Sequence, residues 1–332
     1  MTVDVARPAS TQLGAWRSGL FAAAALAVGG AAVYALDPAR SPQVANFAIV
    51  FASLLVEAVP FIVLGALVSA LIEVFVPARV FGRLGALPGR VQLPLAGLAG
   101  LAFPVCECGS VPVARRLITK GLTPAAAVTF MLAAPVLNPV VVASTVVAYS
   151  GRPSLWPMVM GRVGLGLTVA MAVGWVVGRG SSAALLGAGR PARNHDHGSG
   201  KGRAFFGHLS DDFTFMGRYL VVGAALAAAL QTFVPQSIIA SVADAPIVNL
   251  VAMMALAFVL SLCSESDAFV AASFVEFGVG AQLAFLVFGP MVDTKLGVLY
   301  TGTFSRAFTA TVVVVVTGVT LAGALWMEVL FG

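Results

Sequence analysis

The sequence has few charged side chains. Asp, Glu, Lys and Arg together make up 10% of its 332 residues, against about a quarter in an ordinary soluble domain. Apolar residues make up 59%, and several uninterrupted apolar runs exceed the ~18 residues that predict a membrane-spanning helix. This composition excludes an ordinary soluble protein. We expect an all-α, polytopic protein of the cell (cytoplasmic) membrane, with the lipid bilayer as its first partner.

Other features are also scarce. Three cysteines are an odd number and too few for a disulfide framework. No segment of the form GxxxxGK[ST] occurs, which argues against direct use of ATP by this chain. The net charge of +5 does not indicate nucleic-acid binding, because most Lys and Arg fall in a few short loops. We therefore expect no cofactor and no nucleic-acid partner.

The chain contains an internal duplication. Three pairs of segments match in the same order, at offsets of 158, 157 and 155 residues: VLGALVSALIEVFVP (63–77) with VVGAALAAALQTFVP (221–235), LAGLAFPVC (98–106) with ALAFVLSLC (255–263), and VTFMLAAPVLN (128–138) with LAFLVFGPMVD (283–293). Chance similarity among apolar helices would not keep the order and the offset. The sequence therefore predicts two structural repeats.

The loop charges predict that the two repeats are inverted. The loop at 77–90 carries Arg79, Arg83 and Arg90, whereas its counterpart at 236–246 has no basic residue. Basic loops stay on the cytoplasmic side of a membrane. We therefore expect equivalent loops of the two repeats on opposite sides, an arrangement that many secondary transporters share.

The cysteine regions are too short to cross the bilayer and return as ordinary spans. Residues 91–105 would reach about 22 Å as a helix, less than the ~30 Å hydrocarbon core. We expect re-entrant hairpins at 91–121 and 246–278, with tips CECGS and CSESD, and we expect Gly109 and Pro112 to break the first tip. The alternative is that both hairpins cross fully, which fits the basic loops less well.

These patterns predict the whole architecture: two inverted repeats, each with a re-entrant helical hairpin and a broken transmembrane helix, plus an extra N-terminal helix. The predicted parts are an N-terminal tail and first helix (1–42), the first repeat (43–178), a cytoplasmic linker (179–206) and the inverted second repeat (207–332). The predicted crossings are 18–36, 43–76, 124–150, 154–178, 207–235, 280–303 and 304–328. The N-terminus is expected in the cytoplasm, with a cleaved signal peptide as the alternative reading of the first crossing.

Two of the predicted crossings are interrupted at equivalent positions. The first contains APVLNP at 134–139, and the second contains GPMVDTK at 289–295. Breaks of this kind expose backbone groups that only protein or a water-filled cavity can satisfy. Paired broken segments in the two repeats indicate the place of a transport site.

The chemically reactive residues gather at the tips and the breaks. All three cysteines lie at the two tips, and thiolates favour soft metal ions and metalloids. An acidic side chain at mid-membrane depth costs at least ~2.5 kcal/mol, so it needs a partner or a function. The alternative is that each thiol is only a small apolar side chain. The predicted substrate-binding residues are Cys106, Glu107, Cys108, Ser110, Asn138, Cys263, Ser264, Glu265, Asp267, Asp293 and Lys295; for a metal ion, the ligands would be Cys106, Cys108 and Cys263.

Two further candidates lie outside that set. Glu57 falls within an apolar span and is a further acidic candidate, whereas Lys295, within the set, is the expected partner of Asp293. His195 and His197 form an HxH pair in the linker. Weak metal binding there is one reading, but a solvated linker is the better one, because no third ligand is near.

The motifs at the tips and the first break resemble a known family. CECGSVPVARRLITKGLTPAAAVTFMLAAPVLNPVVV, followed later by LCSESDAFVAASF, is similar to the predicted permeases that include the bacterial organoarsenical efflux permeases. The resemblance covers about residues 45 to 325. It implies membrane transport, with the tip cysteines carried over as Cys106, Cys108 and Cys263. It does not fix the substrate, and it implies that some members act beside a second membrane subunit.

The sequence thus favours a permease over an enzyme. We expect a secondary transporter that exports a thiophilic metal or metalloid species, such as a trivalent arsenical or a soft divalent metal, held between the two tips. One alternative is a membrane-embedded thiol–disulfide enzyme that uses Cys106 and Cys108. Another is a channel-like subunit of a larger membrane complex. A second membrane subunit or a homo-oligomer is compatible with each reading.

Overall fold

The computed structural model describes residues 42–103, 105–178, 201–233 and 246–331. The chain divides into two compact units, residues 1–50 and 51–332. Residues 42–50 of the first unit are the start of a helix that continues into the second unit, and the site described below lies in the second. The predicted crossing at 18–36 and the HxH pair of the linker lie outside the described residues, as does the orientation of the N-terminus.

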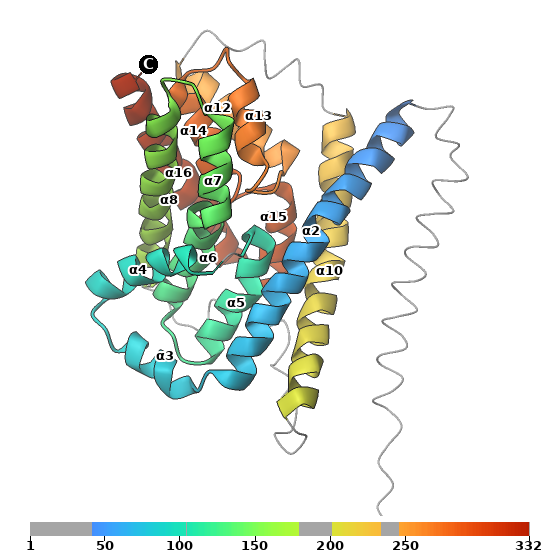
Figure 1. The fold of residues 1–332 in the computed structure, drawn as a ribbon, viewed down its shortest axis with the longest axis vertical. Helices are drawn as coiled ribbons and strands as arrows, with labels where there is room; N and C mark the ends of the chain where they lie inside the picture. Colours follow the sequence, from blue (N-terminus) through green and yellow to red (C-terminus); the bar gives the residue numbers. More distant parts are fainter. Residues whose placement is uncertain (1–41, 104, 179–200, 234–245, 332) are drawn as a thin grey trace, which may run out of the picture. The chain divides into compact units, whose positions relative to one another are not determined.

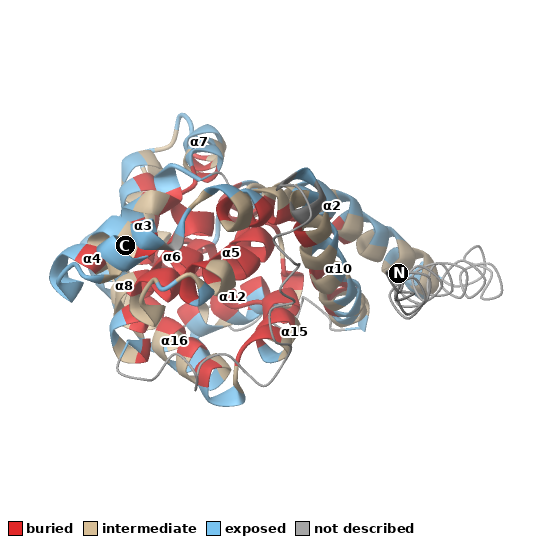
Figure 2. Cartoon of the chain, turned by 90° about the horizontal axis from the view of Figure 1, so that it is seen from below, coloured by how far each residue is buried: buried red, intermediate tan, exposed pale blue. Residues whose placement is uncertain are grey.

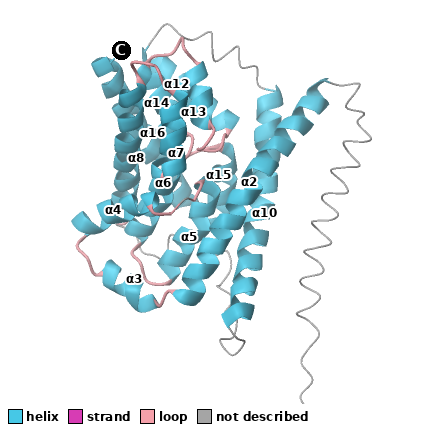
Figure 3. Cartoon of the chain, in the orientation of Figure 1, coloured by secondary structure: helices cyan, strands magenta, loops and turns pink. Residues whose placement is uncertain are grey.

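All regular structure in the described residues is helical (Figure 3). The helices before the linker are α2 (Pro42–Phe75), α3 (Ala78–Gly85), α4 (Gly89–Leu98), the short 3-10 helix η1 (Ala99–Leu101), α5 (Glu107–Thr119), α6 (Pro124–Leu137), α7 (Pro139–Ala148) and α8 (Leu155–Val177). Those after it are α10 (Lys201–Phe233), α12 (Pro246–Leu260), α13 (Asp267–Ser273), α14 (Val279–Phe288), α15 (Thr294–Thr303) and α16 (Arg306–Phe331).

The order of elements repeats along the chain. In each half a long helix (α2, α10) is followed by a helix that ends in a break (α4, α12) and by a helix that follows the break (α5, α13). A helix broken in two comes next (α6 and α7, α14 and α15), and a long helix closes the half (α8, α16). This order agrees with the duplication that the sequence predicts.

Five helical segments within the described ranges are long and apolar enough to span a membrane: Pro42–Phe75, Pro124–Ala148, Leu155–Val177, Phe205–Phe233 and Arg306–Phe331. They coincide with five of the predicted crossings, which confirms a polytopic, all-α membrane protein. The crossing predicted at 280–303 is divided between α14 and α15 around residues 289–293, as its Gly-Pro sequence suggests.

Two repeat-related helices form the centre of the second unit. Every residue of α6 from Ala126 to Leu137 is buried, and so is every residue of α14 from Gly280 to Phe288. Figure 2 shows this buried interior, with α6 among the buried helices and exposed surface on the outer helices. α8 packs against α6, and α16 packs against α14. Each central helix is therefore covered on one side by the long helix that ends its own half.

The break in the first cysteine region corrects one expectation. Gly109 and Pro112 do not interrupt a helix; both lie inside α5, and the described residues just before it, 102–103 and 105–106, are non-helical. A helix tolerates Pro near its start, where the first backbone N–H groups have no helical acceptor. Pro112 is the sixth residue of α5 and lacks the N–H that would bond to the carbonyl of Cys108. That carbonyl is therefore left without its helical partner.

Candidate functional site

The two cysteine-bearing breaks meet inside the protein. Figure 1 shows α5 in the lower part of the second unit and α12 and α13 in the upper part. The Oγ atom of Ser264, in the second break, donates a hydrogen bond of 3.0 Å to Oε2 of Glu107, the first residue of α5. Both side chains are buried. The tips predicted from the sequence therefore converge on one site.

The first tip is packed tightly against α2. A Cβ atom added to Gly65 of α2 would lie 2.4 Å from the Cα of Gly109, so the two backbones touch where only glycine fits. Cys106, the N-cap residue of α5, and Cys108 are buried among apolar side chains of α2 and α10, including Ile62 and Met216. The two thiols belong to the same buried cluster and are both free.

The second tip is held by its own backbone and by α2. Ser261 has a φ of +49°, a left-handed conformation that is uncommon for residues other than glycine. Its Oγ accepts a bond of 3.3 Å from the backbone N–H of Lys295. Farther along the break, Ser266 donates to Oε1 of Glu57 on α2 at 2.9 Å. Glu57, a candidate from the sequence, thus belongs to the site.

A close ion pair holds the start of α13. Nη2 of Arg162, on α8, lies 2.7 Å from Oδ2 of Asp267, and both side chains are at most 3% exposed. The same atom donates to the carbonyl of Ser264 at 3.2 Å, and Nη1 donates to Oγ1 of Thr145 at 3.0 Å. One arginine therefore joins three elements of the site by short, charge-assisted bonds.

A looser arrangement surrounds the start of α5. Nζ of Lys295 lies 3.7 Å from Oε1 of Glu107 and 3.8 Å from Oδ2 of Asp293, and all three side chains are 1% exposed. None of these three atoms has a hydrogen-bond partner among the described residues. The sequence predicted the pairing of Lys295 with Asp293 but not the contact with Glu107. The charges are close enough to attract one another and too far apart to be hydrogen-bonded.

Each tip is paired with a basic residue from the other half of the chain. Glu107 at the first tip is paired with a base from the second half, and Asp267 at the second tip is paired with a base from the first half. The helix contacts cross in the same way, because α15 packs against α5 and α7 packs against α13. Each tip is therefore positioned by the opposite half.

Acidic groups outnumber basic groups at this junction. Hydrogen bonds and ion pairs there join five carboxylates with two bases: Glu57, Glu107, Glu265, Asp267 and Asp293 with Arg162 and Lys295. One oxygen each of Glu265 and Asp267 is also buried without a hydrogen bond. An unpaired buried charge costs several kcal/mol. The site therefore favours protons or a cationic solute.

In both halves, the helix that follows the break is capped at its start by a polar side chain. Oδ1 of Asn138 accepts a bond of 3.0 Å from the N–H of Val140 at the start of α7. Oδ1 of Asp293, the equivalent residue, accepts a bond of 2.6 Å from the N–H of Leu296 in α15. Both side chains cap a helix N-terminus, but only Asp293 also faces a base of the site.

The predicted residues fall into three groups. Contacts of the described structure bring together Glu107, Ser264, Glu265, Asp267, Asp293 and Lys295. Ser110 and Asn138 make local bonds, to the carbonyl of Glu107 and at the cap of α7. The three cysteines are free and buried. Within the described ranges, no group of three or more His, Cys, Asp or Glu side chains is arranged to hold a metal ion.

Sequence reasoning missed Arg162 and Thr145. Arg162 is nevertheless visible as the single charged residue within the apolar segment that forms α8. A lone arginine in a membrane span is costly and needs an acidic partner, so this signal was available. Thr145 carries no such signal, because a threonine inside a helix usually bonds its own backbone, as this one also does to the carbonyl of Val141 at 2.8 Å.

The fold and this buried polar site define a polytopic membrane protein of the transporter class. The family model described as "Predicted permease" (ArsP_1) matches residues 43–328, and the chain belongs to this family. It is 38% identical over 284 residues to "UPF0718 protein YcgR" of Bacillus subtilis (strain 168), a match that covers 84% of this chain and 96% of that protein.

A second relative comes from Streptococcus mutans serotype c (strain ATCC 700610 / UA159). It is named "Putative two-component membrane permease complex subunit" and is 35% identical over 267 residues, which cover 78% of this chain and 87% of that protein. No solved structure matches the chain. The family resemblance expected from the cysteine motifs is therefore confirmed.

Proposed function

We propose that this permease is a secondary transporter that exports a thiophilic metal or metalloid species, bound where the two tips meet. The observation that carries the proposal is the junction itself. Two cysteine-bearing breaks converge there, joined by the bond from Ser264 to Glu107, and acids outnumber bases around them. A solute that is both soft and cationic matches both features.

The arrangement of the hairpins supports an inverted-repeat mechanism. The pair α4 and α5 and the pair α12 and α13 each consist of a helix, a break and a second helix, and the crossed ion pairs relate the two breaks. In transporters with inverted repeats the substrate site lies at the repeat interface, formed by discontinuous helices. The junction of the two tips is such an interface.

The thiols are proposed to act in sequence. Cys106 and Cys108 are buried in the same cluster at the first tip, so a soft solute can be captured by this pair. Cys263 lies on the facing tip and would add the third thiolate as the tips rearrange around the solute. Movement between two- and three-thiol binding would release the solute on the other side. A thiol–disulfide enzyme is less well supported, because all three thiols are buried away from any protein partner.

The proposal is tested by uptake into inside-out vesicles of zinc, copper(I), arsenite and methylarsenite. We expect the wild type to accumulate one of them and Cys106→Ser, Cys108→Ser and Cys263→Ser each to lose more than about 90% of that uptake, because oxygen is a poor ligand for soft ions. The matched control is Ala322→Ser on the exposed face of α16. Normal transport by the three cysteine variants would show that the thiols are not the binding groups.

We also propose that transport is coupled to protons carried by the excess carboxylates. Lys295 faces Glu107 and Asp293 without a hydrogen bond to either, so protonation of one acid would free the lysine to move to the other. A proton could thus replace the exported solute at the site. The measurement is uptake with and without a collapsed pH gradient at constant membrane potential. Equal rates would exclude proton coupling while leaving the thiol site intact.

A second membrane subunit is proposed as partner. The name of the relative from Streptococcus mutans supports this, since it describes a subunit of a two-component permease complex. Purification of the tagged chain from its native membrane, followed by size analysis in mild detergent, tests the proposal. A chain that runs alone and transports in purified proteoliposomes would contradict it.

A further inference from the structure

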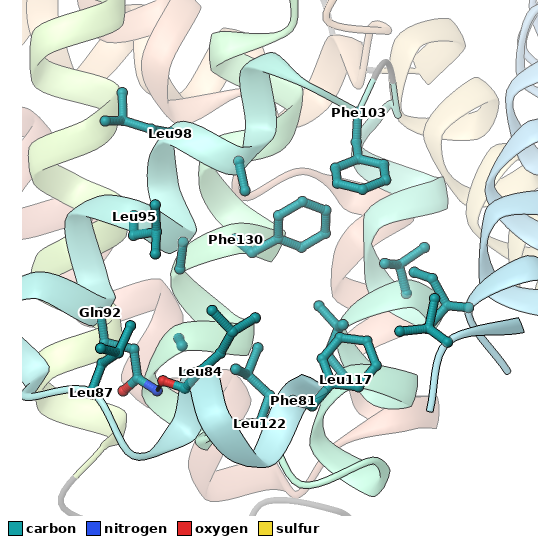
Figure 4. A pocket seen from close by; sticks show the side chains of 16 residues that line it. Phe81, Leu84, Leu87, Gln92, Leu95, Leu98, Phe103, Leu117, Leu122 and Phe130 are labelled. Atoms are coloured by element: carbon teal, nitrogen blue, oxygen red, sulfur yellow. Dashed lines mark hydrogen bonds between the residues drawn. The ribbon is translucent and has the colours of Figure 1, made fainter. Parts of the chain in front are cut away.

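An apolar cavity of about 520 Å³ lies beside the first hairpin. Its walls come from the end of α2 and from α3, α4, η1, α5 and α6, and Figure 4 shows their side chains converging around it. A cavity of roughly 150 Å³ lined by similar residues already holds a benzene molecule. This one therefore has room for a much longer apolar group.

The interior of the cavity offers water nothing to bind. Gln92 is the one amide among its lining residues, the rest being apolar. Both ends of that amide are already used: Nε2 donates to the carbonyl of Leu84 at 3.0 Å, and Oε1 accepts from Oγ1 of Thr123 at 2.8 Å. Water needs two to four polar partners to occupy a cavity, so the occupant is apolar.

The cavity opens to the outside of the helix bundle. Leu95 and Leu98 of α4 line it and remain 48% and 47% exposed, and Phe103, just after η1, is 38% exposed. In a membrane-spanning protein, such exposed leucines and phenylalanines face lipid tails. A lipid chain can therefore enter from the side.

Arginines stand beside the cavity on the same elements. α3 turns Phe81 and Leu84 toward the cavity, whereas Arg79 and Arg83, four residues apart and on one face, are exposed. Arg90, in the first turn of α4, is exposed as well. A short helix with an apolar face inward and arginines outward is typical of one that lies at the membrane surface.

We propose that the cavity holds one acyl chain of an anionic phospholipid, with its phosphate bound by Arg79, Arg83 and Arg90. The apolar cavity accounts for the chain and the three arginines account for the headgroup charge, since basic clusters next to a membrane attract anionic lipids. The site is independent of the transported solute and of the thiols.

The position of the cavity gives this lipid access to the first tip. Phe103 lies in the break before α5, and Val113 and Leu117 on α5 complete the wall. The bound chain would thus support the helix that carries Cys108. Removing the lipid leaves that face of α5 beside an empty space, which weakens packing.

The test measures lipid retained by the purified chain in nanodiscs and in detergent. With equal parts of phosphatidylglycerol and phosphatidylcholine offered, we expect native mass spectrometry to show about one tightly held phosphatidylglycerol per chain. Ala99→Trp places an indole in the cavity and should reduce that population at least ~5-fold. Ala322→Trp, on the exposed face of α16, is the matched control. Equal retention in the two variants would overturn the cavity as the binding site.

The arginines are tested separately, because their removal should not affect folding. The triple variant Arg79→Gln, Arg83→Gln and Arg90→Gln should lower the preference for phosphatidylglycerol over phosphatidylcholine by ~10-fold or more, while Arg306→Gln, another exposed arginine, should not. An unchanged preference would overturn the headgroup assignment. If Ala99→Trp does not fold, this comparison alone decides between an anionic lipid site and none.

Discussion

The two tips of this permease carry similar residues and are held in different ways. At the second tip, Asp267 lies 2.7 Å from Arg162 in a pair that also engages Ser264 and Thr145. At the first tip, Glu107 lies 3.7 Å from Lys295, which stands equally far from Asp293. A close hydrogen-bonded pair fixes a structure, whereas a loose group of charges can rearrange at low cost. We therefore expect the second tip to be the more rigid anchor and the first tip to be the one that rearranges.

The helices that follow the tips differ in the same direction. α5 runs for 13 residues and begins with the two-cysteine motif, whereas α13 has 7 residues. The break before α13 contains the one described residue other than glycine with a positive φ, Ser261. Backbone of that kind persists only where its surroundings determine it. The second tip is therefore locked by its backbone as well as by its ion pair.

Removing the anchoring arginine should have the largest effect. Arg162→Met leaves Asp267 buried without its partner, and breaking a buried pair in this way costs about 3–5 kcal/mol. We expect a large fall in folded yield and in the thermal unfolding midpoint in detergent. Arg162→Met combined with Asp267→Leu should recover part of the loss, because no charge is left unpaired.

Thermal unfolding also distinguishes the role of Lys295 at the first tip from that of Arg162 at the second. Lys295→Met should lower the unfolding midpoint less than Arg162→Met does, since Lys295 makes no hydrogen bond through Nζ whereas Arg162 makes three, yet it should reduce solute uptake by more than ~10-fold. Lys295→Arg is the matched control, because it keeps the charge. A larger stability loss for Lys295→Met than for Arg162→Met would reverse the roles assigned to the tips.

The close approach of α2 and α5 should come next in size. Gly65→Ala puts a methyl group where the Cα of Gly109 lies, so the helices must separate, at about 1–3 kcal/mol. Gly164→Ala on α8 meets no atom within 4 Å and should be neutral or slightly stabilising. Thermal unfolding of the two variants side by side gives the comparison. Equal unfolding midpoints would mean that α2 and α5 can separate at this contact without loss of stability.

The helix caps should give the smallest effect. Asn138→Ala removes the bond to Val140 and should cost about 1 kcal/mol, as other caps do, with transport retained. Asp293→Ala removes an equivalent cap but also a carboxylate near Lys295, so we expect transport to fall as well. If Asn138→Ala abolishes uptake without loss of stability, Asn138 contacts the solute, as the sequence suggested.

The sequence predicts the positions of the helices better than it predicts the side-chain contacts between them. Hydropathy, the repeated segments and the paired Pro-containing breaks are local or periodic signals, and the helices follow them closely. The position of the first break was misjudged, because Pro112 suggests an interruption that the packing of α5 overrides. Its cost is limited to one missing backbone bond.

The ion pairs could not be predicted from the repeats. Neither Arg162 nor Lys295 has a basic counterpart in the other half: at the offset of 155 residues, Thr317 and Val140 stand in the equivalent places. The duplication therefore predicts where the acids and thiols meet but not which base faces them. Such pairings depend on contacts between helices more than 100 residues apart, which no local pattern encodes.

One helix touches both tips. On α2, Glu57 accepts a bond from Ser266 of the second tip, and eight residues on, Gly65 abuts Gly109 of the first. Pro60 lies between them, where the helix lacks one backbone bond and bends most easily. The contacts with the two tips therefore lie on opposite sides of the most easily bent point of α2. We expect displacement of the first tip to be transmitted along α2 to the second tip.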